Sequence, residues 1–414
     1  MGHPLLPTLA SENNSIILQG RMDKQPKFIL TINVGSSSLK FGLYKYETLE
    51  AGYIGAVEIG DDTNGLFAVK DATGDIIFTK KGPYNNPVAA FNELVKWLNQ
   101  NKLVEYIVAA GHRIVQGGAA GKHPALLTDY MLHNLCKLVY LAPNHLPAEL
   151  EVINIFRDTF PAIPQIACFD NSFHQHMPDC AKYYALPEKY KNMGLQRYGF
   201  HGLSYEYIME RLSGKTAALG RKRIIIAHLG NGASMVAVKN SIGVDTTMGM
   251  SPMGGLVMGT RPGDLDPGVS LFLLKHEQLT ADELDTLFSK ESGLKAIGGF
   301  SDVRKLLNIE LHNPDARAAI ELFCYQAKKM IGSLAAAIGG IDILVFTGGI
   351  GANAAVIRER ICTDMDFMGI ELNPKSNRNN LEFISSADSR VEVKVMQTDE
   401  EWMIASHTKN LINN

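Results

Sequence analysis

The segment Phe28–Tyr46, FILTINVGSSSLKFGLYKY, sets the pattern from which the fold is predicted. Its apolar run from Phe28 to Val34 predicts a buried strand, and the alternation of Leu39, Phe41 and Leu43 predicts a second strand. A short turn of glycine and serine separates the two. The segment therefore predicts a β-hairpin with a polar tip.

The same design returns almost 200 residues further along the chain. The segment Arg223–Asn240, RIIIAHLGNGASMVAVKN, again joins an apolar strand through a glycine-rich turn to a second apolar strand. Two spaced copies of one design suggest two related α/β domains that face one another across a cleft, each with a backbone-rich loop.

Helices and further strands are predicted around these hairpins. One domain crossover is placed near Asp170, and a return near Asp399 lets the final helix pack on the first domain. The other expected elements are a helix over 88–100, a strand that ends in GHRIVQGG, helices over 129–140 and after Pro147, the buried strand IPQIACFD, an irregular Gly/Pro stretch over 243–268, and, near the end, a strand over 341–346, a glycine turn TGGIGAN and the amphipathic helix AAVIRERIC.

Composition restricts the class of protein. The 414 residues suggest two to three domains, and 40 basic against 43 acidic residues give a formal charge of −3. A nucleic-acid binder or a polybasic membrane binder would need a basic excess. The apolar runs are shorter than the roughly 18 residues of a membrane-spanning helix. A soluble α/β enzyme is expected.

The cysteines and the first residues bear on location. The five cysteines form no CxxC pair, which disfavours a disulfide framework or a zinc ribbon and favours a reducing cytoplasm. Residues 1–26 lack a cationic segment followed by a long apolar run, so they do not resemble a secretory signal. They are interpreted as a poorly ordered leader.

The two hairpin tips suit a phosphate chain. The first, Asn33–Lys40, offers hydroxyls, backbone amides and one ammonium in a small space, and the second is His228–Gly232. A solvated turn is the alternative for either tip alone. Paired loops across a cleft would hold the two ends of one polyphosphate.

Single polar residues at the ends of apolar stretches are further candidates. Arg113 and Arg261 lie among glycines, where a guanidinium can reach carboxylate or phosphate oxygens. Asp170 ends an apolar strand, where an acid is costly unless it faces a site or a partner. His201 is flanked by glycines, whereas the His174-x-His176 pair has no third residue at zinc-ligand spacing.

Two other nucleotide motifs and one acidic cluster leave alternatives open. Gly214-Lys215-Thr216 imitates the end of a P-loop, but Met209 stands where the first glycine is required and a helix precedes the motif. Gly349–Ala354 matches the dinucleotide pattern GxGxxA, which makes a dinucleotide-dependent oxidoreductase the rival function, although no complete strand–helix–strand unit with a ribose-binding acid is expected to follow it. The cluster Asp399–Glu401 could cap a helix or bind magnesium.

Together these segments resemble the acetate kinase family, within the superfamily of acetate and sugar kinases, heat-shock protein 70 and actin. The resemblance runs from about Phe28 to Thr408. Its motifs stand in the family's order: NVGSSSLKF, GHRIVQGG, FDNSFHQHMP, RYGFHGLS, HLGNGAS, MGTRPGDLDPG, FTGGIGAN and TDEEWMIA.

The resemblance implies an α/β fold of two ribonuclease-H-like (actin-like ATPase) domains that face across a nucleotide-binding cleft, in a cytoplasmic homodimer. The expected domains are residues 27–170 with 400–414, and residues 171–399. The implied reaction is reversible transfer of the ATP γ-phosphoryl group to acetate or another short-chain carboxylate, giving ADP and an acyl phosphate. Mg²⁺ would be the metal, with Mn²⁺ as a substitute.

The resemblance also implies site residues. Arg113 and Arg261 would grip the carboxylate and the phosphoryl group, His201 would hydrogen-bond that group with support from His145, and Asp170 would orient the carboxylate or the metal. The nucleotide would lie against Asn33, Ser36, Ser38, Lys40, His228, Leu229, Gly230, Asn231, Gly232, Asp302, Val303, Arg304, Gly349, Ile350, Gly351, Ala352 and Asn353. The acyl group would lie against Arg113, Val115, Phe200 and Pro252, and magnesium would be held by Asn33, Asp170 and Glu400.

The chemistry and the departures from the family pattern complete the prediction. A carboxylate is already a nucleophile at neutral pH, so the transfer needs positioning and charge rather than a strong base. The two arginines, the histidine His201 and magnesium would supply that charge. Asn144 and Leu146 replace an apolar residue and an asparagine of the family. The sequence therefore leaves open whether acetate or propionate is the preferred substrate. Ala352 replaces a glutamate on the nucleotide side. A protein that binds nucleotide without turnover is a further alternative.

Overall fold

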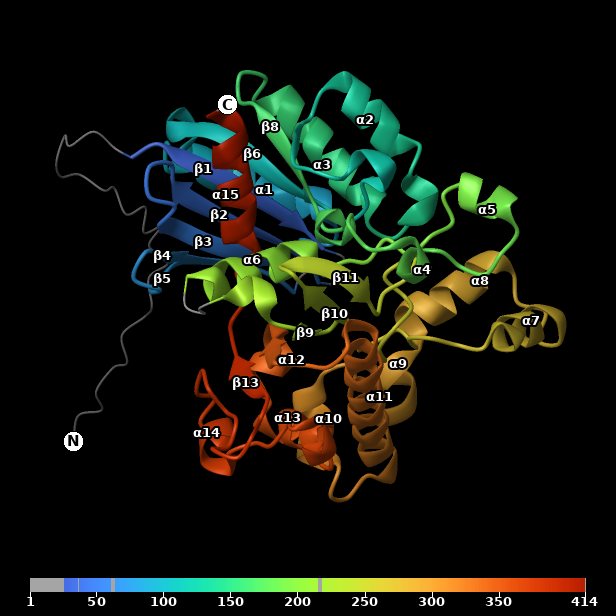
Figure 1. Ribbon diagram of the computed structural model, residues 1–414. Coiled ribbons are helices and arrows are strands. Elements are labelled where there is room, and N and C mark those ends of the chain that lie inside the picture. The colour runs from blue at the N-terminus through green and yellow to red at the C-terminus, as the bar shows by residue number, and fades with distance from the viewer. Residues whose placement is uncertain (1–25, 36, 61–63, 215–217, 414) are drawn as a thin grey trace, which may run out of the picture.

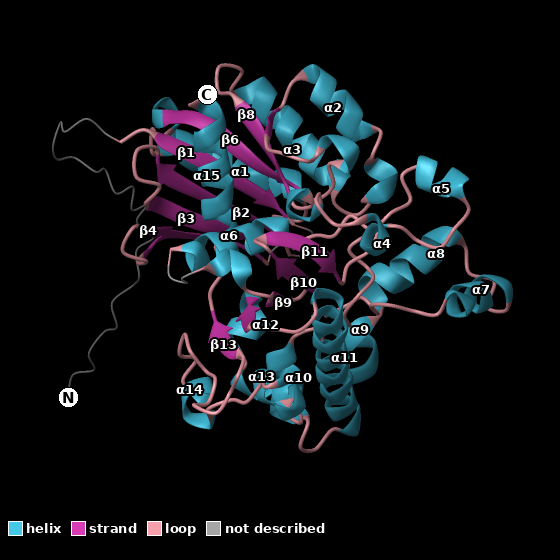
Figure 2. Ribbon diagram, in the orientation of Figure 1, coloured by secondary structure: helices cyan, strands magenta, loops and turns pink. Residues whose placement is uncertain are grey.

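The computed structural model describes residues 26–35, 37–60, 64–214 and 218–413. Apart from Pro26, the predicted leader lies outside these residues, and so do the predicted phosphate-facing Ser36 and the Lys215 and Thr216 of the P-loop imitation. The mixed α/β character predicted from the sequence is confirmed (Figures 1 and 2).

The first sheet contains both strands of the first hairpin. The hairpin strands β1 and β2 are antiparallel, and β6 and β8 run parallel to β1 on its other side. The strand order is β5-β4-β3-β2-β1-β6-β8-β7, with β1 (Phe28–Val34), β2 (Ser38–Lys45), β3 (Ala51–Glu58), β4 (Gly65–Asp71), β5 (Ile76–Gly82), β6 (Ile107–Ile114), β7 (Ala125–Leu126) and β8 (Gln165–Phe169).

The second sheet repeats the centre of the first. Its order is β11-β10-β9-β12-β13, with β9 (Ile224–Leu229), β10 (Ala233–Lys239), β11 (Ile242–Thr246), β12 (Ile343–Thr347) and β13 (Glu392–Val395). The strands β11-β10-β9 are antiparallel, and β12 and β13 are parallel to β9, which matches β3-β2-β1-β6-β8 in order and direction. The predicted recurrence of the hairpin is confirmed, and the whole sheet around it recurs as well.

Each central strand is apolar on both sides because helices cover both faces of its sheet. On one face of the first sheet, α1 (Pro87–Gln100) and α3 (Leu146–Thr159) contribute Phe91, Trp97 and Phe156 to a core with Phe41. On the other face, α15 (Glu400–Ile412) packs along β1, β2, β6 and β8.

Two helices lie together between the sheets. The C-terminal helix α15 contacts α6 (Gly202–Ser213), and Leu203 of α6 shares a core cluster with Ile404 of α15 (Figure 1). Further along α6, Tyr205 and Ile208 pack on Ile226 of the second sheet. The two sheets are therefore linked through a helix pair, and α6 begins directly after His201.

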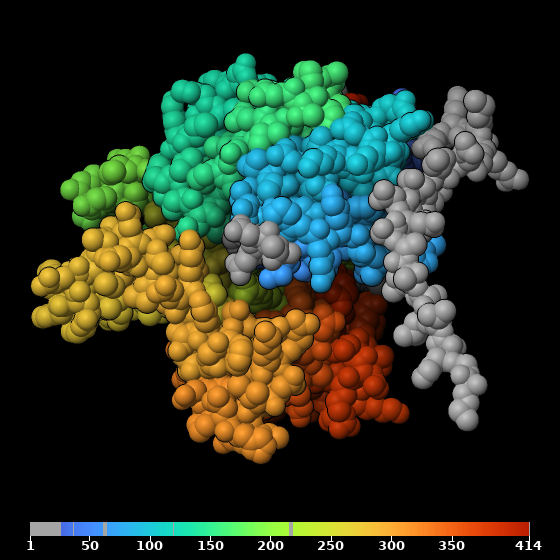
Figure 3. All heavy atoms as spheres, turned by 180° about the vertical axis from the view of Figure 1, so that it is seen from behind, coloured from blue at the N-terminus to red at the C-terminus, as the bar shows by residue number. Residues whose placement is uncertain are grey.

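The opposite face of the second sheet is covered by α11 (Pro314–Ile338). The other helices are α2 (Asp129–Cys136), α4 (Asp179–Lys182), α5 (Glu188–Asn192), α7 (Pro267–Lys275), α8 (Ala281–Thr286), α9 (Gly293–Gly298), α10 (Val303–Ile309), α12 (Gly348–Asn353), α13 (Ala355–Cys362) and α14 (Pro374–Arg378). Seen from behind, the blue-to-green part of the chain gathers at the top of the molecule and the orange-to-red part at the bottom (Figure 3).

Several local predictions are wrong. The helix expected over 129–140 ends at Cys136, and a 3₁₀ turn follows at Val139–Leu141. The start of the stretch expected to be irregular is β11, because Gly243–Thr246 pairs with β10. The predicted turn TGGIGAN includes the helix α12. The GxGxxA motif lies inside a strand–helix–strand unit, since β12 and β13 are parallel neighbours with α12, α13 and α14 between them. The expected lack of a ribose-binding acid stays a prediction.

The predicted domain boundaries stay a prediction. Strands β1–β8 and α15 form one sheet with its covering helix, and β9–β13 form the other sheet, which supports the division near Asp170 and Asp399. Within the described residues, no helix has the length and apolarity needed to cross a membrane.

Candidate active site

The end of β8 meets the end of β6 at an ion pair. The Nη2 of Arg113 lies 2.6 Å from Oδ2 of Asp170, whose side chain is fully buried. The parallel register sets this contact, because Arg113 is opposite Cys168 and the Asp170 backbone N–H donates to Ile114 O at 2.9 Å. The predicted Arg113 and Asp170 are therefore a single structural unit.

Asn33 extends this unit to β1 and to the start of α15. Its Oδ1 accepts from Arg113 Nη1 at 3.2 Å, and its Nδ2 donates to Glu401 Oε1 at 3.1 Å and to Glu400 Oε2 at 3.4 Å. The helix begins here because Asp399 accepts a capping hydrogen bond from the Trp402 N–H. The acidic cluster thus caps the helix through Asp399 and presents Glu400 to the site.

The oxygen atoms of this corner fit a divalent cation. Asp170 Oδ1 is buried and has no hydrogen-bond partner among the described residues. Burial raises the pKa of Glu400 to about 7, with Asp170 and Glu401 contributing and Arg113 opposing. The described residues include no group of three His, Cys, Asp or Glu side chains placed to hold a metal. Mg²⁺ commonly takes one or two carboxylates and fills its remaining positions with water and phosphate, so Asp170 and Glu400 could serve as its protein ligands.

His201 lies directly before α6, the helix that packs on the second sheet. It has φ of 59°, its backbone N–H donates to Asp170 Oδ2 at 3.3 Å, and its Nδ1 is 2.8 Å from Ser234 Oγ. Burial, His228 and the two arginines lower the pKa of His201 well below its ordinary value. The sequence interpretation counted this histidine as a positive charge; the structure favours the neutral ring, which serves as a hydrogen-bonding group.

Arg261 lies near His201. A Cβ on Gly232 would lie 3.3 Å from His201 Nε2 and 3.8 Å from Arg261 Nη1, so the second hairpin tip borders both side chains. Arg261 Nη1 donates to Pro252 O at 2.7 Å. Burial and the charge of Arg113 lower the pKa of Arg261. Two guanidinium groups that repel one another at a buried site are an arrangement that an anion would stabilise.

His145 lies near the same two arginines. Burial first, and then Arg261 and Arg113, lower its pKa to about 4, so it is neutral at pH 7. Val115, Phe200 and Pro252, the predicted acyl wall, are all buried. The structure thus gathers the predicted catalytic residues from both sides of the molecule.

The predicted nucleotide residues extend away from this centre. Lys40 is exposed, pairs with Asn33 across the first hairpin, and its charge acts on Glu400 and His228. Ser38 begins β2 and is half-buried. His228 stacks on His201 with ring centroids 4.3 Å apart, and Ser204 Oγ is 2.8 Å from its Nδ1.

The second tip continues toward the remaining predicted segments. Asn231 is exposed, and a Cβ on Gly259 would contact both Asn231 Oδ1 and Ser301. Asp302 caps α10 through the Arg304 N–H, ahead of the buried Val303. The predicted residues Gly349, Ile350, Gly351, Ala352 and Asn353 form α12, which packs on β9 beside Leu229, between the tip residues His228 and Gly230.

The structure places the three residues that depart from the family pattern. The Asn144 side chain is exposed and donates to Asp285 Oδ2 at 3.1 Å, so it bridges to α8. Ala352 is fully buried in the core, whereas its neighbour Asn353 is exposed and bonds to Gly349 O and Gln397. Leu146 is fully buried at the start of α3.

Sequence reasoning missed several supporting residues. Glu149 is buried and accepts from the Val115 N–H at 3.2 Å, Ser234 holds His201, and Tyr205 bonds to Ser234. Ser234 and Ser204 stand in the motifs HLGNGAS and RYGFHGLS, which was the available signal. Glu149 carries no such signal, because a glutamate on an amphipathic helix ordinarily faces solvent.

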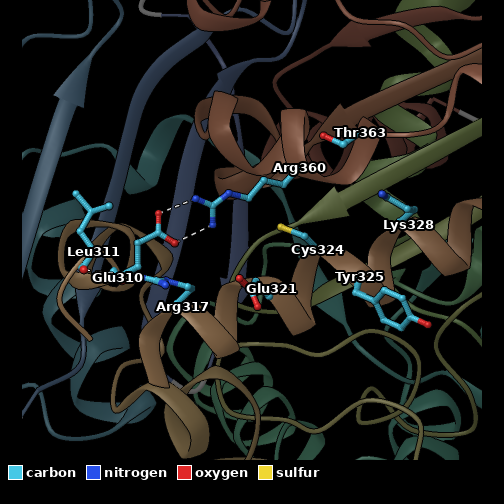
Figure 4. A pocket seen from close by; sticks show the side chains of 9 residues that line it. All are labelled: Glu310, Leu311, Arg317, Glu321, Cys324, Tyr325, Lys328, Arg360 and Thr363. Atoms are coloured by element: carbon cyan, nitrogen blue, oxygen red, sulfur yellow. Dashed lines mark hydrogen bonds and ion pairs between the residues drawn. The ribbon is translucent and has the colours of Figure 1, made fainter. Parts of the chain in front are cut away.

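One cavity lies away from this site. It measures about 510 Å³ between α10, α11 and α13, and its wall includes the ion pair of Glu310 with Arg360, both contacts being 2.7 Å (Figure 4). No predicted site residue lines it.

Known proteins are similar to this chain in sequence and fold over most of its length. A model of the acetokinase family matches residues 28–406. The chain belongs to the acetokinase family. An acetate kinase of Methylocella silvestris is 39% identical over 400 residues, covering 93% of this chain and 98% of the relative.

Solved structures of the acetokinase family agree. A propionate kinase from Francisella tularensis superposes with a TM-score of 0.87 at 36% identity, covering 93% of this chain and 99% of that one. An acetate kinase from Porphyromonas gingivalis gives 0.83 at 36% identity, covering 93% and 100%. The predicted fold class, two ribonuclease-H-like α/β domains, is confirmed by these acetokinase structures.

The buried Glu149 gives a pH-dependent stability. Burial raises its pKa to about 8 from an ordinary 4.5, so between these values the folded state keeps a proton that the unfolded chain releases. The contribution of Glu149 to stability is therefore greatest below pH 4.5 and falls as pH rises to 8. We expect Glu149→Gln to remove this loss, gaining roughly a few kcal/mol over wild type between pH 5 and 8. Chemical unfolding at pH 5, 6.5 and 8 measures it; equal slopes for the two proteins would contradict it.

Proposed function

We propose that the protein is an acetate kinase that transfers the γ-phosphoryl group of ATP directly and reversibly to acetate, giving acetyl phosphate and ADP. The observation that carries this is the convergence of Arg113 and Arg261 beside a buried Asp170 oxygen that has no partner among the described residues. Two mutually repelling cations next to a carboxylate suit an anion in transfer between two anions.

The residues divide the work by position. Arg113 is fixed by Asp170 and Asn33, so its guanidinium is preorganised for an acyl oxygen, whereas Arg261 is held by a backbone carbonyl and carries an uncompensated charge toward the phosphoryl group. Neutral His201, oriented by Ser234, hydrogen-bonds that group in flight, and neutral His145 lies beside it. Preorganised donors of this kind stabilise charge that develops in a loose, in-line transition state.

Asp170 and Glu400, with Asn33 as a neighbour, would hold Mg²⁺, which would supply positive charge to the phosphoryl group when bound. The acid substrate enters as a carboxylate, so no residue has to remove a proton from it. Val115, Phe200 and Pro252 would exclude water from the acyl methyl group, and domain closure would complete that exclusion.

Propionate is the second candidate substrate, because the similar Francisella tularensis structure is named a propionate kinase. One methylene is worth about 1–3 kcal/mol in an apolar pocket, so overlapping activity is expected. An assay of ADP release with magnesium-ATP and acetate, propionate or butyrate, with hydroxylamine trapping of the acyl phosphate, tests the function. No acid-dependent turnover in a protein that binds ATP would favour a nucleotide sensor; stabilisation by NAD and not by ATP would favour the oxidoreductase.

We also propose a homodimer that uses α7. This helix projects from the body (Figure 1) and exposes Val269, Leu271, Phe272 and Leu274, with Leu265 just before it. An apolar face of this kind on a soluble protein marks an interface. We expect Leu271→Asp with Phe272→Asp to shift the mass to that of a monomer in sedimentation experiments. Leu381→Asp, at an exposed leucine elsewhere, is the control; an unchanged mass in the double variant would contradict the proposal.

A further inference from the structure

A second cavity of about 220 Å³ lies beside the crossover that links the two sheets. Its wall includes Asn171 and His174, directly after Asp170, and Gln196 and Arg197, shortly before His201. The segment between these wall residues carries α4 and α5 and is tied to itself by the bond from the Arg197 N–H to Lys182 O at 2.7 Å. None of the predicted catalytic or nucleotide residues lines this cavity.

The charge of the wall is of one sign. Lys122, Lys182 and Arg197 line the cavity, and none of its lining residues is acidic. Arg197 is fixed by backbone carbonyls, since its Nη1 lies within 3.1 Å of the carbonyls of Thr246, Thr247 and Met248. The Lys182 ammonium has a long contact of 3.4 Å to Gln175 O. The cavity between these three cations could therefore accept an anion.

His174 adds a hydrogen-bond acceptor to this basic wall. It is 1% exposed, and its Nε2 lies 3.0 Å from Phe200 O. A carbonyl only accepts, so Nε2 carries the hydrogen and Nδ1 keeps a lone pair. Nδ1 is buried and has no partner among the described residues. Burial lowers the pKa of His174 to about 4, which keeps the ring neutral.

We propose that this cavity binds a small oxyanion that retains a proton, of which inorganic phosphate is the simplest. Its charged oxygens would meet Lys182, Lys122 and Arg197, and its P–OH would donate to His174 Nδ1. A fully ionised oxyanion such as sulfate would meet the same cations but would leave Nδ1 without a donor. The cavity is separate from the residues proposed to hold the transferred phosphoryl group.

An anion bound in this cavity would affect the segments that carry Asp170 and His201. Asn171 follows Asp170 in the chain and accepts from the Gly117 N–H at 3.2 Å, and His174 donates to the carbonyl of Phe200, which precedes His201. An anion in the cavity would therefore brace both ends of the crossover segment. We expect phosphate to raise the thermal unfolding midpoint, because it binds the folded state only.

Calorimetric titration of the full chain with phosphate tests the proposal, and it reads out whether or not the protein proves to be a kinase. Phosphate that binds at the proposed active site would bind equally to wild type and to a Lys182 variant. Only the difference in phosphate affinity between the two proteins therefore reports on the cavity. We expect Lys182→Met to weaken phosphate binding about 10- to 100-fold, the scale of one charge-assisted hydrogen bond, and Lys182→Arg to retain it. The matched control is Lys189→Met, at an exposed lysine of α5 outside the cavity.

A second titration isolates His174. Sulfate should bind wild type about 5- to 10-fold more weakly than phosphate, the scale of one neutral hydrogen bond. Equal affinities for the two anions, equal phosphate affinities in wild type and Lys182→Met, or no phosphate binding at millimolar concentration would each overturn the proposal.

Discussion

Arg261→Ala is expected to lower kcat about 10²- to 10³-fold while leaving the protein folded, because the guanidinium supplies one transition-state charge contact. Among the described residues Arg261 forms no ion pair, and the charge of Arg113 opposes its own. Its removal therefore relieves a repulsion, and the free energy of unfolding should stay within about 1 kcal/mol of wild type or rise. Steady-state kinetics and chemical unfolding measure the two quantities.

Arg113→Ala should show a different combination. It is expected to lose turnover on the same scale and also about 3–5 kcal/mol of stability, since it leaves the fully buried Asp170 carboxylate without its partner. Arg157→Ala, at an exposed arginine paired with Asp129, is the matched control and should change neither quantity. Near-native turnover in both Arg113→Ala and Arg261→Ala would contradict the proposed catalytic roles of the two arginines.

Arg358→Met is expected to lower the free energy of unfolding by about 3–5 kcal/mol. Arg358 is fully buried in α13 and donates to Gly351 O of α12 at 2.8 Å and to Asn377 and Asn380 at the end of α14 and just beyond it. Burial lowers its pKa to about 10, so it stays charged at neutral pH. Its removal takes one donor away from each of four oxygens, which are Gly351 O, Asn377 Oδ1, Asn377 O and Asn380 Oδ1.

The thermal unfolding midpoint and chemical unfolding measure this loss. Because Gly351 belongs to the helix predicted to face the nucleotide, we also expect a raised KM for ATP in Arg358→Met with a smaller change in the KM for acetate. The matched control, Arg378→Met, removes an exposed guanidinium from α14 and should unfold within about 0.5 kcal/mol of wild type. Equal midpoints for the two variants would show that the buried network does not support α12.

Local patterns predicted the sheets well because each central strand is short and apolar. The runs at Phe28–Val34 and Ile224–Ala227 lie in strands as predicted, although the second strand continues to Leu229, and each is followed by an antiparallel partner. The same reasoning failed at TGGIGAN, where helix α12 begins at Gly348, the second residue of the motif. Glycine favours a turn locally, but Gly348 has φ of 76° and lies against Leu229 O, and this close approach lets the helix begin directly after β12.

By itself the sequence determined the repeated hairpin, the α/β class and the motifs that resemble the acetokinase family, because apolar periodicity and glycine spacing are local properties. It could not place Asn144 on the surface or reveal the buried Glu149, and it gave His201 a charge that burial removes. Only the tertiary structure decided that Asn33, Arg113, Asp170 and Glu400 form one network. Parallel pairing of β1, β6 and β8 brings three strand ends together, and the packing of α15 across them delivers the fourth residue from the far end of the chain.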